Sequence, residues 1–222
     1  MRRFCVDQAR AALILGLLAC GEPLEDAGPP VVDAGIPLAE LPFATEVVDF
    51  SPGPGAGFGQ VDYPEIVLGP PKGYGPQRGS TDVLSLGHGG SITLGFAPRV
   101  IIDGAGEDFL VFENPFWVGA SSDNAFSELG SVEVSPDGDN WYQFECNSQQ
   151  IPPDQCAGYT PTERFDSVQP LTPTRCGGDG FDLATLGLTE ARFVRITDLS
   201  HSGGAPSAGF DLDAVGLIHY RE

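Results

Sequence analysis

Glycine and proline punctuate this chain so often that long helices have little room to form. The 222 residues include 30 glycines and 20 prolines, and both residue types weaken or end regular elements. Short apolar runs stand between them, such as 91–96 (SITLGF), 109–114 (FLVFEN) and 191–199 (ARFVRITDL). Runs of this length between turn residues are typical of β-strands. The spacing therefore predicts an all-β fold, with helix limited to a turn or two at 181–188 (FDLATLGL).

The strand signals predict antiparallel pairing. Residues 131–145 (SVEVSPDGDNWYQFE) form the clearest hairpin, with two strand-like runs around a turn at 136–138. No long amphipathic helix stands between strands, which disfavours a parallel α/β fold. We expect one domain over residues 43–222, an antiparallel β-sandwich of the jelly-roll type.

The N-terminus has the pattern of an export signal. Arg2 and Arg3 precede an apolar run, 11–19 (AALILGLLA), which is too short to span a bilayer. The run ends in LLAC, which resembles a bacterial lipobox. That resemblance implies a signal peptide over 1–19, acylation of Cys20 as a membrane anchor, and, with Gly21 next, sorting to the outer membrane, facing the cell surface or the periplasm. The alternative is an ordinary secretory signal with a chance cysteine.

Composition narrows the possible partners. Residues 20–42 combine proline, glycine, alanine and acids without periodicity, as expected of a flexible tether. The formal net charge is −20, and a surface of this sign repels nucleic acid. The acids are consistent either with a soluble exported protein or with one that binds divalent cations.

Cysteines in an exported protein are expected to pair. Cys146 and Cys156 close the shortest loop, across a proline-containing excursion, and this pairing leaves Cys176 free. Pairing of Cys156 with Cys176 is the alternative. A zinc site is disfavoured because the sequence has no CxxC and its three histidines are scattered.

Acidic residues gather at the ends of the predicted strands. In an extended chain Phe109, Val111 and Glu113 share one face, and Asp211, Asp213 and Val215 share another. Carboxylates in line with core residues need neutralisation, and Ca²⁺ takes six to eight oxygens from carboxylates, asparagine and backbone carbonyls. We therefore expect structural calcium, with ligands among Asp108, Glu113, Asn114, Asp179, Asp182, Asp211 and Asp213. The alternative is that these acids are solvated or cap backbone turns.

Patterns for common catalytic chemistry are absent from the sequence. The glycine-rich 53–59 (GPGAGFG) lacks the flanking strand and helix of a dinucleotide site, and GxSxG does not occur. Paired carboxylates of a glycoside hydrolase stay open as an alternative.

Several segments taken in order resemble a family of uncharacterised bacterial cell-surface proteins and lipoproteins. They are SLGHGGSITLGF (85–96), DGAGEDFLVFENPF (103–116), VEVSPDGDNWYQF (132–144), GGDGFDLATLGL (177–188), ARFVRITDL (191–199) and GFDLDAVGLIH (209–219). The resemblance covers about residues 50–219. It implies a galactose-binding-like jelly roll, as in discoidin domains and many carbohydrate-binding modules, with no enzyme activity. It also implies an acid near the last strand, here Asp213, that helps to hold calcium. Glu113 and Asn114 match the family's EN pair, and Asp179 and Asp182 match its GGDxFDL segment.

Together these observations predict a non-catalytic, calcium-stabilised, lipid-anchored module. The expected ligand is extracellular carbohydrate, because aromatic rings stack on sugar faces, and the candidate rings are Trp117, Phe116 and Tyr159. The alternatives are a structural or adhesion protein of the envelope with a protein partner, or a glycoside hydrolase.

Overall fold

A computed structural model describes residues 37–120, 124–163 and 170–222. The predicted signal peptide, the predicted lipidation site Cys20 and most of the predicted tether lie outside these residues. No helix in the described ranges is both long enough and apolar enough to cross a membrane.

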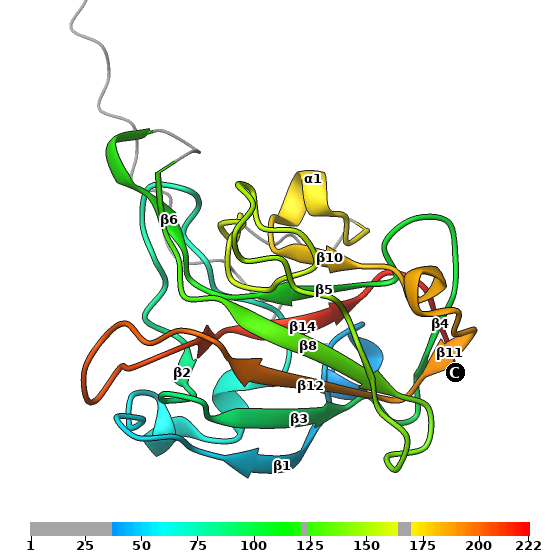
Figure 1. The fold of residues 1–222 in the computed structure, drawn as a ribbon. Helices are drawn as coiled ribbons and strands as arrows, with labels where there is room; N and C mark the ends of the chain where they lie inside the picture. The colour runs from blue at the N-terminus through cyan, green and yellow to red at the C-terminus, as the bar shows by residue number, and fades with distance from the viewer. Residues whose placement is uncertain (1–36, 121–123, 164–169) are drawn as a thin grey trace, which may run out of the picture.

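The larger of two facing layers is a five-stranded antiparallel sheet (Figure 1). Its strands, in spatial order, are β1 (Glu46–Ser51), β3 (Ser91–Gly95), β12 (Phe193–Asp198), β8 (Gly130–Ser135) and β9 (Tyr142–Gln143). The predicted hairpin of 131–145 is present as β8 and β9, with Glu133 opposite Gln143. Strand β12 alternates half-buried and buried residues along its length, so one face of the sheet is directed toward the core.

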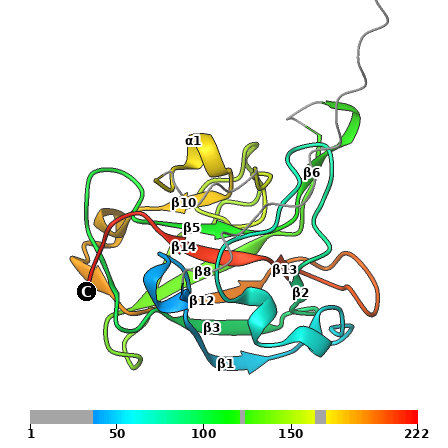
Figure 2. The same ribbon diagram turned by 180° about the vertical axis from the view of Figure 1, so that it is seen from behind.

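The second layer is a three-stranded antiparallel sheet of β10 (Asp179–Phe181), β5 (Phe109–Phe112) and β14 (Ala214–Leu217). Smaller sheets extend the two layers and are best followed in Figures 1 and 2. These are β11 (Glu190–Ala191) with β4 (Val100–Ile102) and β15 (Tyr220–Arg221), β13 (Asp211–Leu212) with β2 (Leu84–Ser85), and β6 (Phe116–Trp117) with β7 (Ala125–Phe126).

The main core lies between the two layers, and both faces of β5 are buried. Phe109 and Val111 belong to the main cluster, together with Ile92 of β3 and Val194 of β12. The alternate residues of β5 pack into a second cluster beneath the N-terminal segment and the helical turn at 173–176. The predicted alternation of β5 is therefore confirmed, and so is the antiparallel β-sandwich. The jelly-roll connectivity stays a prediction.

Helical structure is confined to short turns. The one α-helical turn described is α1 (Pro173–Cys176), and the 3₁₀ turns are η1 (Leu38–Glu40), η2 (Gln60–Asp62), η3 (Glu65–Val67), η4 (Val118–Ala120) and η5 (Leu183–Leu186). Turn η5 is the one that the sequence predicted. Turn α1 was not predicted, because four residues are too few to show a helical period.

One predicted face is wrong. Leu212 and Val215 pack in the same core cluster, whereas Ala214 packs in the other. Strict alternation from Asp211 to Val215 would have put Leu212 and Val215 on opposite faces. The chain changes partner at Asp213, because β13 pairs with β2 and β14 pairs with β5. The change of partner interrupts the extended alternation and separates Asp213 from Asp211.

Candidate functional site

The seven predicted calcium ligands do not meet at one point. Within the described residues, acidic side chains close enough to share an ion form two groups. One consists of Glu113, Glu128 and Asp211, and is called the unsatisfied group below. The other consists of Asp103, Asp108 and Asp182, and is called the capped group. In each group, one carboxylate oxygen from each residue lies within 4.8 Å of the others.

The unsatisfied group is almost completely removed from solvent. Glu113 is 2% exposed, Glu128 is 4% exposed and Asp211 is 7% exposed. Among the described residues, both carboxylate oxygens of Glu113 and Oδ1 of Asp211 are buried with no partner at hydrogen-bond geometry, although the Asn114 backbone N–H is near enough to lower the pKa of Glu113. A buried, unpartnered carboxylate is among the most costly arrangements in a folded protein. This group therefore calls for a bound cation or for protonation.

Three different connections supply these carboxylates. Glu113 directly follows β5, Glu128 lies between β7 and β8, and Asp211 begins β13. Neighbouring hydroxyls reach only part of the group: Ser202 Oγ donates to Glu128 Oε1 at 2.8 Å. The ion pairs of the described lysine and arginine side chains, such as Lys72–Asp82, involve other acids. The charge of His88 lowers the pKa of Glu128 only as the last of its causes, so these contacts do not provide strong neutralisation of this group.

Burial raises the pKa values of all three carboxyl groups, and repulsion from neighbouring acids adds to it. The pKa of Glu113 is raised well above its ordinary value, first by burial and next by the charge of Asp211. Burial followed by the charge of Glu128 raises the pKa of Asp211 to about 7, although hydrogen bonds from Ser85 and Asn114 act in the opposite direction. The pKa of Glu128 is raised mainly by burial. A dication would reverse these shifts by favouring the charged forms.

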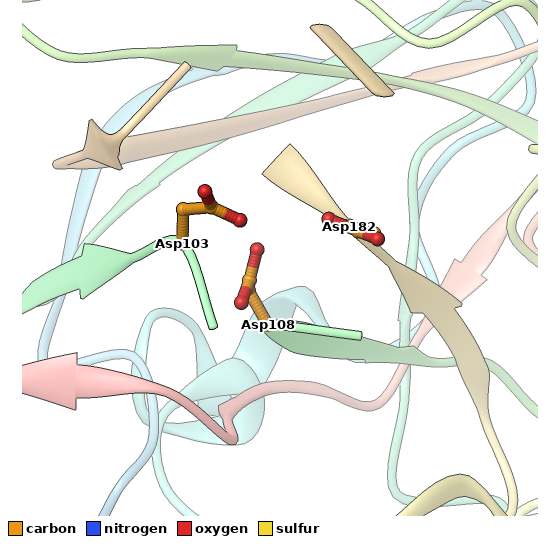
Figure 3. A group of neighbouring side chains, drawn as sticks. All are labelled: Asp103, Asp108 and Asp182. Atoms are coloured by element: carbon orange, nitrogen blue, oxygen red, sulfur yellow. The ribbon is translucent and has the colours of Figure 1, made fainter. Parts of the chain in front are cut away.

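The capped group also brings three carboxylates together, all of them from aspartates (Figure 3), but their environment is different. Asp108 is fully buried, yet both of its oxygens are occupied. Oδ1 accepts hydrogen bonds from the Gly104 backbone N–H at 2.8 Å and lies 2.9 Å from His219 Nδ1. Oδ2 accepts from the Leu183 N–H at 2.8 Å. Donors of the protein itself therefore already satisfy the buried carboxylate at the centre of this group.

The other two members of the capped group lie nearer the surface. Asp182 is half-buried and Asp103 is exposed. Asp182 is the N-cap of η5, and its Oδ1 accepts from the Ala184 N–H at 2.8 Å. Asp108 and Asp182 together fix the start of η5, since they bind successive backbone donors there. Hydrogen bonds to backbone N–H groups therefore account for Asp108 and Asp182. This is the capping that the sequence analysis gave as the alternative to calcium.

The remaining predicted ligands lie outside both groups. Asp179 accepts from three consecutive backbone N–H groups, those of Gly158 at 2.7 Å, Tyr159 at 2.9 Å and Thr160 at 3.1 Å. Burial raises the pKa of Asp179 to about 6, and these hydrogen bonds lower it. Asp213 is also buried, and it accepts from the Lys72 backbone N–H at 3.0 Å. Both side chains therefore tie loops to the sheet by hydrogen bonds.

Asn114 and Tyr159 also make hydrogen bonds that connect loops to neighbouring segments. Asn114 Nδ2 donates to the Ser80 carbonyl at 3.0 Å, and its side chain is close enough to lower the pKa of Asp211, so it stands beside the unsatisfied group. Tyr159 is half-buried, and its backbone N–H is one of the donors to Asp179.

The predicted aromatic residues Phe116 and Trp117 form β6, half of a two-stranded hairpin with β7. This hairpin lies at the edge of the molecule, away from the centre of the two sheets (Figures 1 and 2). Phe116 is half-buried and stacks on Phe126, with ring centroids 5.2 Å apart and planes inclined by 18°. Phe126 is 46% exposed, as is Val118 at the end of the hairpin. Trp117 is half-buried, and its backbone N–H donates to the Pro76 carbonyl at 2.8 Å.

The sequence reasoning missed Glu128 and Phe126. Neither belongs to a recognisable acidic or aromatic motif, since they stand in the polar stretch 123–130 (DNAFSELG). Glu128 lies two residues before β8, a strand that the sequence predicted. This position could have indicated a ligand, but it is a weak signal by itself.

Comparison with known proteins gives little further information. No family model matches the chain, and no curated protein matches it. Among solved structures, a match is found with the C-terminal domain of a chitobiase from Bacteroides fragilis, at 14% sequence identity and a TM-score of 0.29. The match covers 59% of this chain and 62% of that domain, about three fifths of each. A superposition of this quality carries no functional argument.

Proposed function

We propose that this chain is a non-catalytic β-sandwich module that binds carbohydrate and is stabilised by calcium at the unsatisfied group. The observation that supports it is the convergence of Glu113, Glu128 and Asp211, with three carboxylate oxygens buried and unpartnered. As part of the same proposal, the module is exported and attached to the outer membrane through Cys20.

Calcium suits this donor set better than other common ions. The three side chains offer six carboxylate oxygens and no nitrogen or sulfur, which favours a hard cation over zinc or copper. Calcium also tolerates irregular arrangements of six to eight oxygens, whereas magnesium requires a near-ideal octahedron. A set of donors from three separate connections is therefore a better match for calcium.

The cation would tie together the two ends of the aromatic hairpin. Glu113 lies three residues before Phe116 in β6, and Glu128 lies two residues after Phe126 in β7. An ion bound to both carboxylates would fix the base of the hairpin to β13 through Asp211. Calcium would in this way hold the aromatic rings in position, in addition to stabilising the sandwich.

The hairpin supports the carbohydrate part of the proposal. The stacked pair of Phe116 and Phe126 presents an apolar, partly exposed surface at the edge of the fold. Aromatic rings offer a large contact area with little loss of conformational entropy. Hydrolysis by the unsatisfied group is disfavoured, since a glycosidic bond needs access to the carboxylates and these are at most 7% exposed.

Calcium titration tests this proposal. After removal of metal with EDTA, isothermal calorimetry of the wild type with CaCl₂ is expected to show one binding site. Glu113→Gln should weaken binding at least ten-fold, because it removes a charged ligand. Asp103→Asn, which changes the capped group, is the matched control and should bind like the wild type. Equal binding by Glu113→Gln, or loss of binding in Asp103→Asn, would place the ion elsewhere.

A further inference from the structure

A second candidate binding site lies where β9, the disulfide loop and η5 meet. A cavity of about 440 Å³ opens there. It is lined by Gln143, Phe144, Glu145, Asn147, Asp154, Gln155, Thr185 and Leu186. We propose that this cavity, called the amide pocket below, is a saccharide subsite for neutral or amino sugars; the inference rests on the proposed carbohydrate binding.

The lining of the amide pocket matches a ligand rich in hydroxyl groups. Three amide side chains, two carboxylates and one hydroxyl surround it. Amides present a donor and an acceptor side by side, and carboxylates accept pairs of hydroxyls. The half-buried Leu186 adds an apolar side chain to the lining, and the volume is within the range of small-molecule sites. Such a mixture suits a sugar ring, which has polar edges and apolar faces.

The disulfide loop gives this pocket a preformed wall. The predicted Cys146–Cys156 bond is confirmed and closes a loop with a sequence separation of 10 residues. Within it, the Asn147 N–H donates to the Asp154 carbonyl at 2.8 Å. Gln155 has a φ of 56°, a left-handed conformation that is costly for a residue with a side chain and is often found where a ligand is held.

The opposite wall is fixed by the capped group. Asp108 binds the Leu183 N–H and Asp182 binds the Ala184 N–H. These two contacts hold the first residues of η5, and Thr185 and Leu186 follow them directly into the pocket. The capped group therefore has a role in positioning this wall, although it binds no ligand itself.

Charge selects among sugars. Glu145 and Asp154 are the ionisable residues of the lining, and no basic side chain faces them there. Uronic acids and sulfated sugars are disfavoured by repulsion, whereas an amino group would gain an electrostatic contact. The pocket thus predicts a preference for amino sugars over neutral sugars, and for both over uronates.

Binding measured by NMR chemical-shift titration would test the amide pocket. The probes are glucose, galactose, glucosamine and glucuronate, each added to the calcium-loaded protein. The pocket variant is Gln143→Ala with Glu145→Ala, two exposed side chains whose truncation leaves the core intact. Gln60→Ala, an exposed residue of η2, is the matched control.

The expected result is that glucosamine and a neutral sugar shift the wild type and the control, that glucuronate does not, and that the pocket variant binds at least ten-fold more weakly. Unchanged binding in the pocket variant overturns the subsite. If Phe126→Ala then abolishes that binding, the carbohydrate function holds at the hairpin and only the amide pocket is wrong. If the wild type binds none of the probes and no sugar on a glycan array, carbohydrate binding itself is wrong.

Discussion

Each of the two acidic groups of this protein brings three carboxylates together, but the two groups have opposite solutions to the problem of buried charge. In the capped group, Asp108 is fully buried and accepts two backbone N–H bonds beside His219. In the unsatisfied group, Glu113 is almost as inaccessible, and neither of its oxygens has a partner at hydrogen-bond geometry among the described residues. Backbone donors delivered by local turns make the difference. A cluster of acids therefore indicates a metal site only where the protein's own donors do not already occupy the oxygens.

The largest expected effect is in the capped group. Asp108→Ala should destabilise the fold by about 3 kcal/mol or more, because it leaves the Leu183 N–H buried without an acceptor and also removes the acceptor of the Gly104 N–H. The decrease in the free energy of unfolding should be the same in calcium and in EDTA. Urea denaturation under both conditions measures it, with Asp103→Ala as a control that stays within about 0.5 kcal/mol of wild type. A loss that depends on calcium would contradict the distinction between the groups.

A somewhat smaller effect is expected in the unsatisfied group, and it should depend on metal. Calcium at 100 times its Kd should stabilise the wild type by about 2.7 kcal/mol. Asp211→Asn should lose most of this gain. In EDTA the same variant should be as stable as the wild type or more so, since it removes a buried charge at neutral pH.

Thermal unfolding with and without calcium provides the measurement for Asp211→Asn. Asp103→Asn, which should keep the full calcium effect, is the control. Strong destabilisation of Asp211→Asn in EDTA would contradict the distinction between the two groups. It would mean that the Asp211 carboxylate has hydrogen-bond donors in the metal-free protein, as Asp108 has.

The smallest effect, counted per pH unit, is the dependence of stability on pH. The pKa of Asp211 in the fold is about 7, against 3.8 as its ordinary value. A raised pKa means that the folded state holds the proton more tightly than the unfolded state. Stability from this group is therefore present at low pH and is lost as pH rises from about 4 to 7, by at most about 1.4 kcal/mol per pH unit.

Melting temperatures in EDTA between pH 5 and pH 7.5 would show this trend, which Asp211→Asn should reduce. Saturating calcium should also flatten it, because a bound cation favours the ionised form. A melting temperature that rises over this range in EDTA, with the same slope in Asp211→Asn, would mean that the carboxyl group is not destabilised by burial.

The fold and part of the site could be predicted because they follow from local patterns. Alternation in 109–112 identified both faces of β5, and proximity in the chain identified the Cys146–Cys156 bond. Glu113 and Asp211 were recognised because each continues a strand. Glu128 was not, because its partners are distant in the chain and no motif surrounds it. The assignment of Asp213 to the face of Asp211 was wrong, because a change of strand partner leaves no mark on the residue pattern.

The sequence by itself determined the class of fold, since frequent glycine and proline leave only short strands, and alternating residues then require two sheets around one core. The sequence also determined which of the predicted strands have acidic residues at their ends. Tertiary structure alone decided which of those acids are satisfied, because a backbone N–H reaches a carboxylate only when a particular turn is brought beside it. Asp108 and Glu113 are five residues apart, and the folding of distant loops around them gives one its donors and leaves the other without any.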